Sequence, residues 1–233
     1  MHVDEQVLEP VRTRYGEPVT LEFEGEISRR ERDIVVQSTQ RDRFHDVTFF
    51  VFRGDRLALI QKPHYTEGLW RPPGGGLRPG EPFEAGVERE AFEELGARIA
   101  LTRYLVVSSA VFGYTPCGPS ARGRGSQPAR CVQTGNTGLD DRPEIGLRPI
   151  RGTAAALPRT EAIPWTTHVL AATTADVELA PVDTHEISAA RWGTLAELQG
   201  PIRKRLLATG TTFWRYRVAL HDAAAAALEA GGG

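Results

Sequence analysis

A cluster of acidic residues directly after three glycines constrains this sequence more than any other feature. The stretch Gly74–Ile99 reads GGGLRPGEPFEAGVEREAFEELGARI. Its apolar residues recur every fourth position, at Phe83, Val87, Ala91 and Leu95. That period predicts a helix with one apolar face, which begins near Glu81 and Pro82 and ends at Gly96.

The carboxylates of this predicted helix crowd one another. Residues three and four apart are neighbours on a helix, so Glu90, Glu93 and Glu94 share one face. Each like-charged pair costs about 0.2–0.5 kcal/mol, and the C-terminal end of a helix disfavours negative charge further. Arg89 neutralises only part of this charge. We therefore expect a bound Mg2+, with Mn2+ as a substitute, because hard cations prefer oxygen ligands. The adjacent glycines let backbone groups approach that ion or a phosphate closely.

The same stretch resembles the Nudix box, the signature of the Nudix hydrolases. Its fixed positions are matched at the required spacing by Gly75, Glu81, Arg89, Glu90, Glu93, Glu94 and Gly96. Ala91 and Ala97 stand in its hydrophobic positions. The detailed resemblance covers Gly75–Ala97, and the flanking predicted strands and helices agree with the family more loosely. It implies an α/β fold, in which a mixed sheet is sandwiched between helices.

The resemblance also implies a chemistry and a set of roles. Family members hydrolyse a nucleoside diphosphate linked to another moiety, by attack of a metal-activated water on phosphorus. The metal ligands implied here are Glu90, Glu93, Glu94 and a backbone carbonyl of Gly74 or Gly75. Arg89 is then expected to orient Glu93, and Glu81 to brace the loop without touching the metal.

The general base and the substrate contacts are less narrowly defined by the sequence. A box glutamate, Glu93 or Glu94, or an outside residue can serve as base, and Glu186 in THEISAARW is the best outside candidate. Glu144 and Glu161 are weaker candidates. The substrate contacts are expected just before and within the glycines, at Trp70, Arg71, Gly75 and Gly76. Packing of Trp70 into the core is an equal alternative.

The acidic cluster is also compatible with other interpretations. The residues alone are compatible with a solvated helix face, and a complete Nudix box with a nucleotide-binding sensor that has no catalytic activity. A Nudix-fold isomerase acting on isopentenyl diphosphate needs a cysteine in a structured strand. Cys117 and Cys131 instead lie in a segment rich in glycine and proline, which argues against that chemistry.

Alternation and turn residues predict the organisation of the chain. Residues 1–40 are expected to form a small N-terminal β extension, with a strand around Val19–Phe23, a solvated turn at Arg29–Asp33 and a second strand at Ile34–Val36. Residues 41–230 form the predicted Nudix domain, interrupted by a long loop at about 113–164. The other elements predicted in this domain are a hairpin (45–52 and 56–62), strands at 99–114, 165–173 and 186–192, and helices at 195–207 and 212–229.

Composition sets the broad class of the protein. The chain has 233 residues, is 40% hydrophobic and carries a net charge of −2, so no nucleic-acid or membrane partner is expected. The apolar runs are strand-sized and no signal peptide is recognisable, so we expect a cytoplasmic protein whose two cysteines are free thiols. A nucleotide is the expected small-molecule partner, and the N-terminal extension suggests a homodimer. No particular nucleotide derivative can be named.

Overall fold

A central hairpin forms where the sequence predicts one. In the computed structural model, β2 (His45–Arg53) and β3 (Arg56–Gln61) pair in antiparallel fashion around a tight turn. Gly54 adopts φ +62° in that turn, a conformation that residues with a Cβ rarely adopt. The structure describes residues 5–39, 45–116 and 161–231, and the account below concerns the unit that runs to Tyr114 and resumes at Glu161.

Six strands form one mixed sheet in the order β1-β4-β5-β2-β3-β6. The other strands are β1 (Val19–Glu26), β4 (Ala100–Tyr114), β5 (Glu161–Thr173) and β6 (Ala189–Thr194). The pairs β1–β4 and β2–β5 are parallel, and the remaining neighbours are antiparallel. The mixed sheet and the flanking helices confirm the predicted α/β class.

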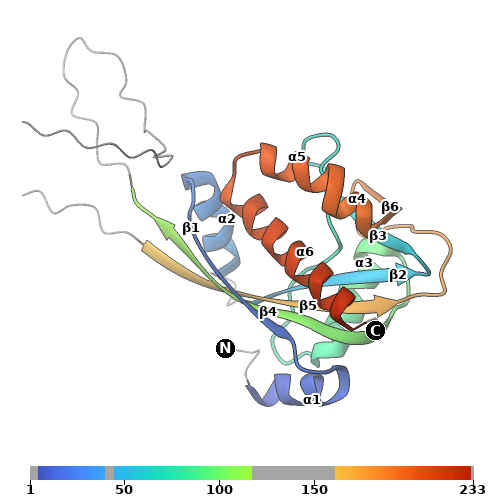
Figure 1. The fold of residues 1–233 in the computed structure, drawn as a ribbon. Coiled ribbons are helices and arrows are strands. Elements are labelled where there is room, and N and C mark those ends of the chain that lie inside the picture. Colours follow the sequence, from blue (N-terminus) through green and yellow to red (C-terminus); the bar gives the residue numbers. More distant parts are fainter. Residues whose placement is uncertain (1–4, 40–44, 117–160, 232–233) are drawn as a thin grey trace, which may run out of the picture. The chain divides into compact units, whose positions relative to one another are not determined.

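Helices cover both faces of the sheet (Figure 1). One core contains apolar residues of α6 (Thr212–Ala230), α5 (Arg203–Ala208), the π-helical turn Leu198–Ile202 and α2 (Arg29–Thr39). The second core contains those of α1 (Glu5–Tyr15) and α3 (Phe83–Leu95). The short α4 (Leu195–Glu197) leads into the π-helical turn. The acidic helix α3 and the C-terminal helix α6 therefore lie on opposite sides of the sheet.

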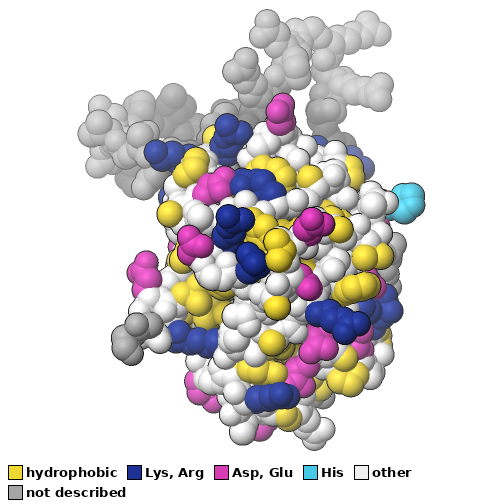
Figure 2. Space-filling model, turned by 90° about the vertical axis from the view of Figure 1, so that its right-hand side faces the viewer, with side chains coloured by type: hydrophobic (Ala, Val, Ile, Leu, Met, Phe, Trp, Pro, Cys, Tyr) yellow, Lys and Arg dark blue, Asp and Glu magenta, His cyan; other side chains and the backbone are white. Residues whose placement is uncertain are grey.

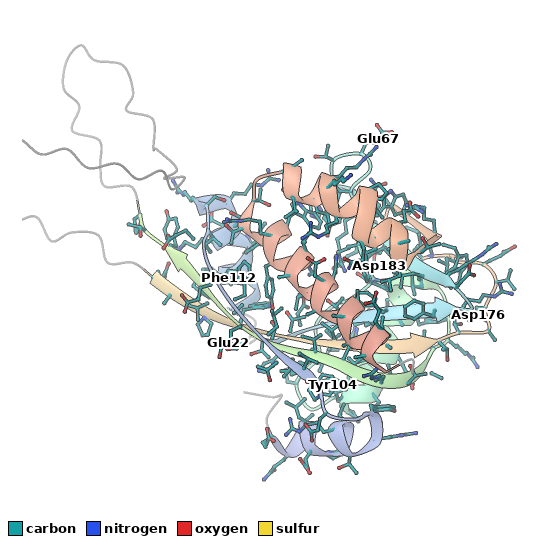
Figure 3. All side chains as sticks on the ribbon, in the orientation of Figure 1. Glu22, Glu67, Tyr104, Phe112, Asp176 and Asp183 are labelled. Carbon is teal, nitrogen blue, oxygen red and sulfur yellow. The ribbon has the colours of Figure 1, made fainter. Side chains whose placement is uncertain are left out.

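An irregularity in β4 changes the face to which its side chains point. Tyr104 and Phe112, both labelled in Figure 3, would share a face in a regular strand because they are an even number of residues apart. The register against β5 shifts between Tyr104 and Val106, which leaves Leu105 as an extra residue. Tyr104 consequently packs in the core with α3, whereas Phe112 packs in the core with α6.

The N-terminal segment corrects one prediction. The expected strand at Val19–Phe23 is confirmed as β1, which pairs with β4 at the edge of the main sheet. The turn expected at Arg29–Asp33 and the strand expected at Ile34–Val36 are wrong, because both lie in helix α2. Ser28 and Glu31 form a capping box: the Glu31 carboxylate accepts the Ser28 backbone N–H at 2.9 Å, and the Ser28 hydroxyl accepts the Glu31 N–H at 3.3 Å.

The ends of the predicted loop also need correction. Both boundaries of the predicted loop, 113 and 164, fall inside strands. Strand β4 runs to Tyr114, which pairs with Glu161, the first residue of β5. Pro164 nevertheless lies within β5. At this position β5 pairs only with β4, since its pairing with β2 begins at Thr166. A strand tolerates proline where no neighbour needs its N–H. The rest of the predicted loop, with Cys117, Cys131 and Glu144, lies outside the described residues.

The surface shows mixed charge. On the face drawn in Figure 2, acidic and basic side chains are interspersed among apolar and neutral ones. Within the described ranges, no helix is both long enough and apolar enough to cross a bilayer.

Candidate functional site

Helix α3 is the scaffold of the candidate site. Its buried face consists of Phe83, Val87, Ala91 and Leu95, as the apolar period predicts. Gly96 ends the helix with φ +67°, and a Cβ there would lie 2.1 Å from the carbonyl oxygen of Ala180. Only glycine fits this combination of left-handed backbone and close neighbour, which gives Gly96 a structural role.

Arg89 is the hub of the acidic cluster. Its Nη1 donates to Glu90 Oε1 and to Glu93 Oε2, each at 2.9 Å. Its Nε and Nη2 donate to Oε1 and Oε2 of Glu81 at 2.7 and 2.9 Å. A fifth hydrogen bond runs from Nη2 to the Gly76 carbonyl at 3.1 Å. One guanidinium therefore fixes three carboxylates and the end of the glycine loop.

Glu81 holds the loop that precedes α3. Besides its two bonds from Arg89, it accepts the backbone N–H of Arg78 at 3.0 Å. The hydrogen bonds from Arg89 lower the pKa of Glu81, so it stays ionised. Gly86 makes room for this arrangement, since a Cβ there would lie 2.4 Å from Leu77 and 2.8 Å from Glu81 Oε2. The helix-weakening glycine is thus explained by packing.

The three glycines bring the backbone against the sheet and the acids. A Cβ on Gly74 would lie 2.2 Å from the Val47 carbonyl, and one on Gly75 would lie 2.0 Å from Glu90 Oε2. The Gly75 carbonyl accepts the Val47 N–H at 2.9 Å. The Gly74 carbonyl, one of the predicted metal ligands, accepts a hydrogen bond from Arg71 Nη2 at 3.3 Å. A carbonyl oxygen has two lone pairs, so this bond leaves one for another partner.

Glu94 forms a buried ion pair. Its side chain is 3% exposed, its Oε2 accepts the Gly74 N–H at 2.6 Å, and its Oε1 lies 3.5 Å from Arg71 Nη2. Arg71 is itself buried and also donates to the Tyr65 hydroxyl at 3.0 Å and the Pro72 carbonyl at 2.8 Å. Burial raises the pKa of Glu94, and the charges of Arg71 and Lys62 partly offset that rise.

Glu186 is joined to Glu94 through a lysine. Lys62 Nζ lies 2.8 Å from Glu186 Oε2 and 3.7 Å from Glu94 Oε1. Hydrogen bonds to the end of α3 hold the loop that carries Glu186, because the N–H groups of Val182 and Asp183 donate to the Glu93 carbonyl at 3.0 and 2.9 Å. The labelled Asp183 (Figure 3) then accepts the Glu186 N–H at 3.0 Å. The structure thus brings the outside base candidate to the acidic helix.

The remaining candidates lie elsewhere. The indole of Trp70 faces Arg191, whose guanidinium carbon is 4.6 Å from the ring centroid. Glu161 pairs with Arg32 of α2, whose Nη2 donates to its Oε1 at 3.0 Å. Glu144 lies outside the described residues.

The charge balance at the site differs from the expectation. Four cationic side chains, not Arg89 alone, pair with the acids: Lys62, Arg71, Arg78 and Arg89. The premise that Arg89 is the only nearby counter-charge is therefore wrong, while the expected cation stays a prediction. Lys62 and Arg78 were missed because their partners are distant in sequence. The sequence predicts that Arg71 contacts a phosphate. In the structure Arg71 is buried and pairs with Glu94, a position that the local sequence does not indicate.

The donor set nevertheless fits a hard cation. In the described part of the chain, no three His, Cys, Asp or Glu side chains are gathered tightly enough to form a ready-made metal site. Glu90 and Glu93 share one Arg89 nitrogen, with side chains 16% and 35% exposed. The absence of a Cβ at Gly75 keeps a peptide group directly beside Glu90. Carboxylate and carbonyl oxygens in such proximity are the ligands that Mg2+ prefers.

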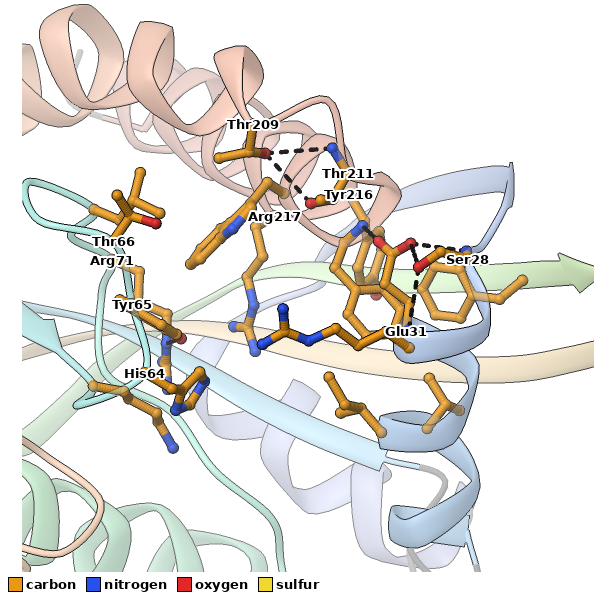
Figure 4. A pocket seen from close by; sticks show the side chains of 18 of the residues that line it. Ser28, Glu31, His64, Tyr65, Thr66, Arg71, Thr209, Thr211, Tyr216 and Arg217 are labelled. Carbon is orange, nitrogen blue, oxygen red and sulfur yellow. Dashed lines mark hydrogen bonds between the residues drawn. The ribbon is translucent and has the colours of Figure 1, made fainter. Parts of the chain in front are cut away.

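A pocket of about 490 Å³ adjoins the buried ion pair on the side of α6. Lys62 and Arg71 both line it, so the pocket and Glu94 share these two side chains. Figure 4 shows His64 and Tyr65 on one side of the pocket and Glu31 on the opposite side, with Arg217 between them. Its volume falls in the range of small-molecule sites.

A comparison with protein families matches most of this chain to one family. A family model described as NUDIX domain matches residues 42–210. The NAD-capped RNA hydrolase NudC of Chromobacterium violaceum is 35% identical over 65 residues, 28% of this chain and 24% of that protein. The chain thus matches about a quarter of that relative's length. Among solved structures, a NUDIX hydrolase from Nitrosomonas europaea has a TM-score of 0.41 at 14% identity, covering 78% of this chain and 90% of that one. A MutT NUDIX hydrolase from Burkholderia pseudomallei has a TM-score of 0.37 at 23% identity, covering 75% of this chain and 94% of that one.

Proposed function

Since this chain belongs to the Nudix hydrolase family, we propose that it cleaves a phosphoric anhydride bond in a nucleoside diphosphate linked to another moiety. The observation that carries the proposal is the hub around Arg89, where one guanidinium holds Glu81, Glu90 and Glu93 beside the glycine loop. Such a network fixes carboxylates in place, as a preorganised polar site requires.

Divalent metal chemistry is part of this proposal. Nudix enzymes generally use divalent cations, and we assign Mg2+, with Mn2+ as a substitute, to Glu90, Glu93, Glu94 and the Gly74 carbonyl. When bound, the cation would supply Lewis-acid stabilisation of phosphate oxygens and an acidified water. Glu90 and Glu93 are partly exposed and can exchange Arg89 for another cation at little desolvation cost. Glu94 is buried, so it contributes a fixed oxygen at the base of the site.

The other residues act on position and proton transfer. Arg89 orients Glu93 and Glu90, and Glu81 fixes Arg89 by its two parallel hydrogen bonds. Glu186 remains the outside candidate for the general base, because its side chain is 63% exposed and can reach a water while Lys62 holds its carboxylate. Glu93 is the alternative base within the helix. Gly75 and Gly76 present backbone groups toward a phosphate.

A substrate panel tests the proposed reaction. Purified protein with Mg2+ is incubated with nucleotide sugars, ADP-ribose, dinucleotide polyphosphates and nucleoside triphosphates, and released phosphate and mononucleotides are quantified. We expect cleavage of at least one class, abolished by EDTA and restored by added Mg2+ or Mn2+. Glu93→Gln is the appropriate inactive variant, because its side chain is 35% exposed and its loss leaves no buried charge unpaired. Glu88→Gln, on the exposed side of the same helix, is the matched control.

The panel also separates catalysis from simple binding. Nucleotide binding without cleavage of any panel member, at saturating Mg2+ and Mn2+, would contradict the hydrolase proposal and favour a sensor. Cleavage by Glu93→Gln at the wild-type rate would contradict the assigned role of that residue.

A further inference from the structure

Segments outside the matched family region build half of the pocket beside Lys62 and Arg71. Half of its lining residues lie before residue 42 or after residue 210. Those before it belong to α2 and its cap, such as Arg30 and Ile34, and those after it belong to the start of α6, such as Trp214. The family region supplies the acidic helix, whereas this chain's own flanking segments supply much of the pocket wall.

Specific hydrogen bonds hold the two flanking segments together. Glu31 caps α2 through Ser28 and also accepts the backbone N–H of Phe213 at 2.9 Å, so one carboxylate satisfies both helix N-termini. The hydroxyl of Thr212 donates to the Glu26 carbonyl, just before α2. Glu31 is buried, so this link is shielded from water. The pocket wall is therefore a fixed part of the fold.

Aromatic side chains form the inner wall of the pocket. Tyr65 and Trp214 meet edge to face, with ring centroids 5.0 Å apart and an interplanar angle of 77°. Trp165 and Phe213 also line the pocket and are only partly buried. A flat ring such as a nucleobase gains stacking and burial against such surfaces.

Cationic side chains also line the pocket, among them Lys62, Arg71 and Arg30. Burial lowers the pKa of His64, and the charges of Lys62, Arg30 and Arg71 lower it further. Arg71 and Lys62 already pair with carboxylates. Among the described residues, the exposed Arg30 guanidinium makes no ion pair or hydrogen bond, so its donors are available to a ligand.

We propose that this pocket binds the nucleoside monophosphate part of the substrate, with the base against Trp214 and Tyr65 and the phosphate beside Arg30 and His64. This inference rests on the proposed function in that it takes the bound nucleotide to be part of the substrate. Binding of a mononucleotide in the pocket does not itself require catalysis. Base selection then lies at Trp214 of α6 and at Tyr65, both outside the Nudix box. The phosphate end lies toward Arg30 of α2 and faces Lys62, which contacts Glu94 and Glu186.

Equilibrium binding in EDTA tests the pocket without any hydrolysis. AMP, GMP, CMP and UMP are titrated by calorimetry, and the tightest one is compared with its nucleoside and with ribose 5-phosphate. We expect Arg30→Ala to weaken the mononucleotide at least fivefold and to leave the nucleoside unchanged. Trp214→Ala should weaken both, and Trp214→Phe should retain part of the affinity because a ring remains. Arg29→Ala, an exposed neighbour that does not line the pocket, is the matched control.

The outcomes separate this inference from the proposed reaction. If no mononucleotide binds, or if Arg30→Ala and Trp214→Phe bind it like wild type while thermal unfolding shows them folded, the pocket assignment is wrong. Hydrolysis with an unchanged KM in Arg30→Ala would overturn the pocket and leave the reaction standing. Mononucleotide binding that depends on Arg30, without cleavage of any panel member, would support the pocket and overturn the reaction.

Discussion

Arg89 and Glu81 form a bidentate pair, with Nε 2.7 Å from Oε1 and Nη2 2.9 Å from Oε2. The pair joins the loop before α3 to the middle of the helix, and it leaves Nη1 of the same guanidinium for Glu90 and Glu93. A planar fork of donors is the geometry that lets one side chain serve three carboxylates.

Replacing Arg89 with lysine should therefore remove more than a charge. A lysine ammonium cannot reproduce the parallel bonds to Glu81 while reaching Glu90 and Glu93. We expect Arg89→Lys to lower kcat by tenfold or more, with a smaller change in KM, in steady-state assays at saturating Mg2+. Arg98→Lys, on an exposed residue just after the helix, is the control. Unchanged kcat in Arg89→Lys would show that the hub does not position reacting groups.

Glu94→Gln should lower stability as well as activity. The substitution removes the carboxylate that opposes the buried Arg71. Removing one partner of a buried ion pair costs about 3–5 kcal/mol. Urea unfolding of Glu94→Gln, Arg71→Met and the double variant measures the coupling between the two residues. We expect the double variant to be more stable than the sum of the single losses implies. Strict additivity would contradict a buried pair.

Gly75→Ala should disturb Glu90 specifically. The added Cβ would lie 2.0 Å from Glu90 Oε2, so the carboxylate must move away from the glycine loop. We expect at least a tenfold loss of kcat/KM with little change in thermal stability. Gly200→Ala is the matched control, because nothing lies within 4 Å of its Cβ position. Equal activity of Gly75→Ala and wild type would remove Glu90 from the proposed site.

Buried histidines should make the fold sensitive to acid. Burial, together with neighbouring cations, lowers the pKa of His221 to about 3, and its Nε2 has no hydrogen-bond partner in the described structure. The unfolded chain binds this proton near pH 6.5 and the folded chain does not, so stability is complete above pH 6.5 and falls toward pH 3. Between pH 6.5 and pH 3 the slope approaches about 1.4 kcal/mol per pH unit for each such histidine. His168, with a pKa of about 3, adds a second such histidine.

Thermal unfolding between pH 7.5 and 5 tests this effect. His221→Phe keeps an aromatic ring against Phe50 and removes the titrating group, so its melting temperature should fall less on acidification than that of wild type. His185→Gln, on an exposed residue, should keep the wild-type dependence. Parallel curves for His221→Phe and wild type would refute the assignment.

The sequence predicts α3 well because its signals are local. The apolar period, Pro82 before the first turn and the left-handed Gly96 all lie within the element that they define. The same logic fails for α2, where the β-branched residues Ile34 and Val35 suggest a strand. Its capping box, Ser28 with Glu31, was the available helix signal. The contact of Glu31 with Phe213 is tertiary and leaves no trace in the local pattern.

The candidate site likewise combines contacts set by local spacing with contacts set by the tertiary fold. The spacing of Glu90, Glu93 and Arg89 on one helix places them together before any fold is known. The partners of Glu94 come from distant segments: Arg71 precedes the glycines, and Lys62 directly follows the central hairpin. Burial of Arg71 depends on the packing of the whole sheet, so sequence alone suggested a phosphate contact for it.

Metal titration tests the central claim most directly, namely that the acids of α3 form a divalent cation site. Calorimetric titration of Mn2+ into wild type, Glu93→Gln and Glu88→Gln, with a nucleotide present, compares a proposed ligand with an exposed glutamate of the same helix. We predict saturable binding to wild type and Glu88→Gln, with at least tenfold weaker binding to Glu93→Gln. Equal affinity in all three proteins, or no binding to wild type, would contradict the account.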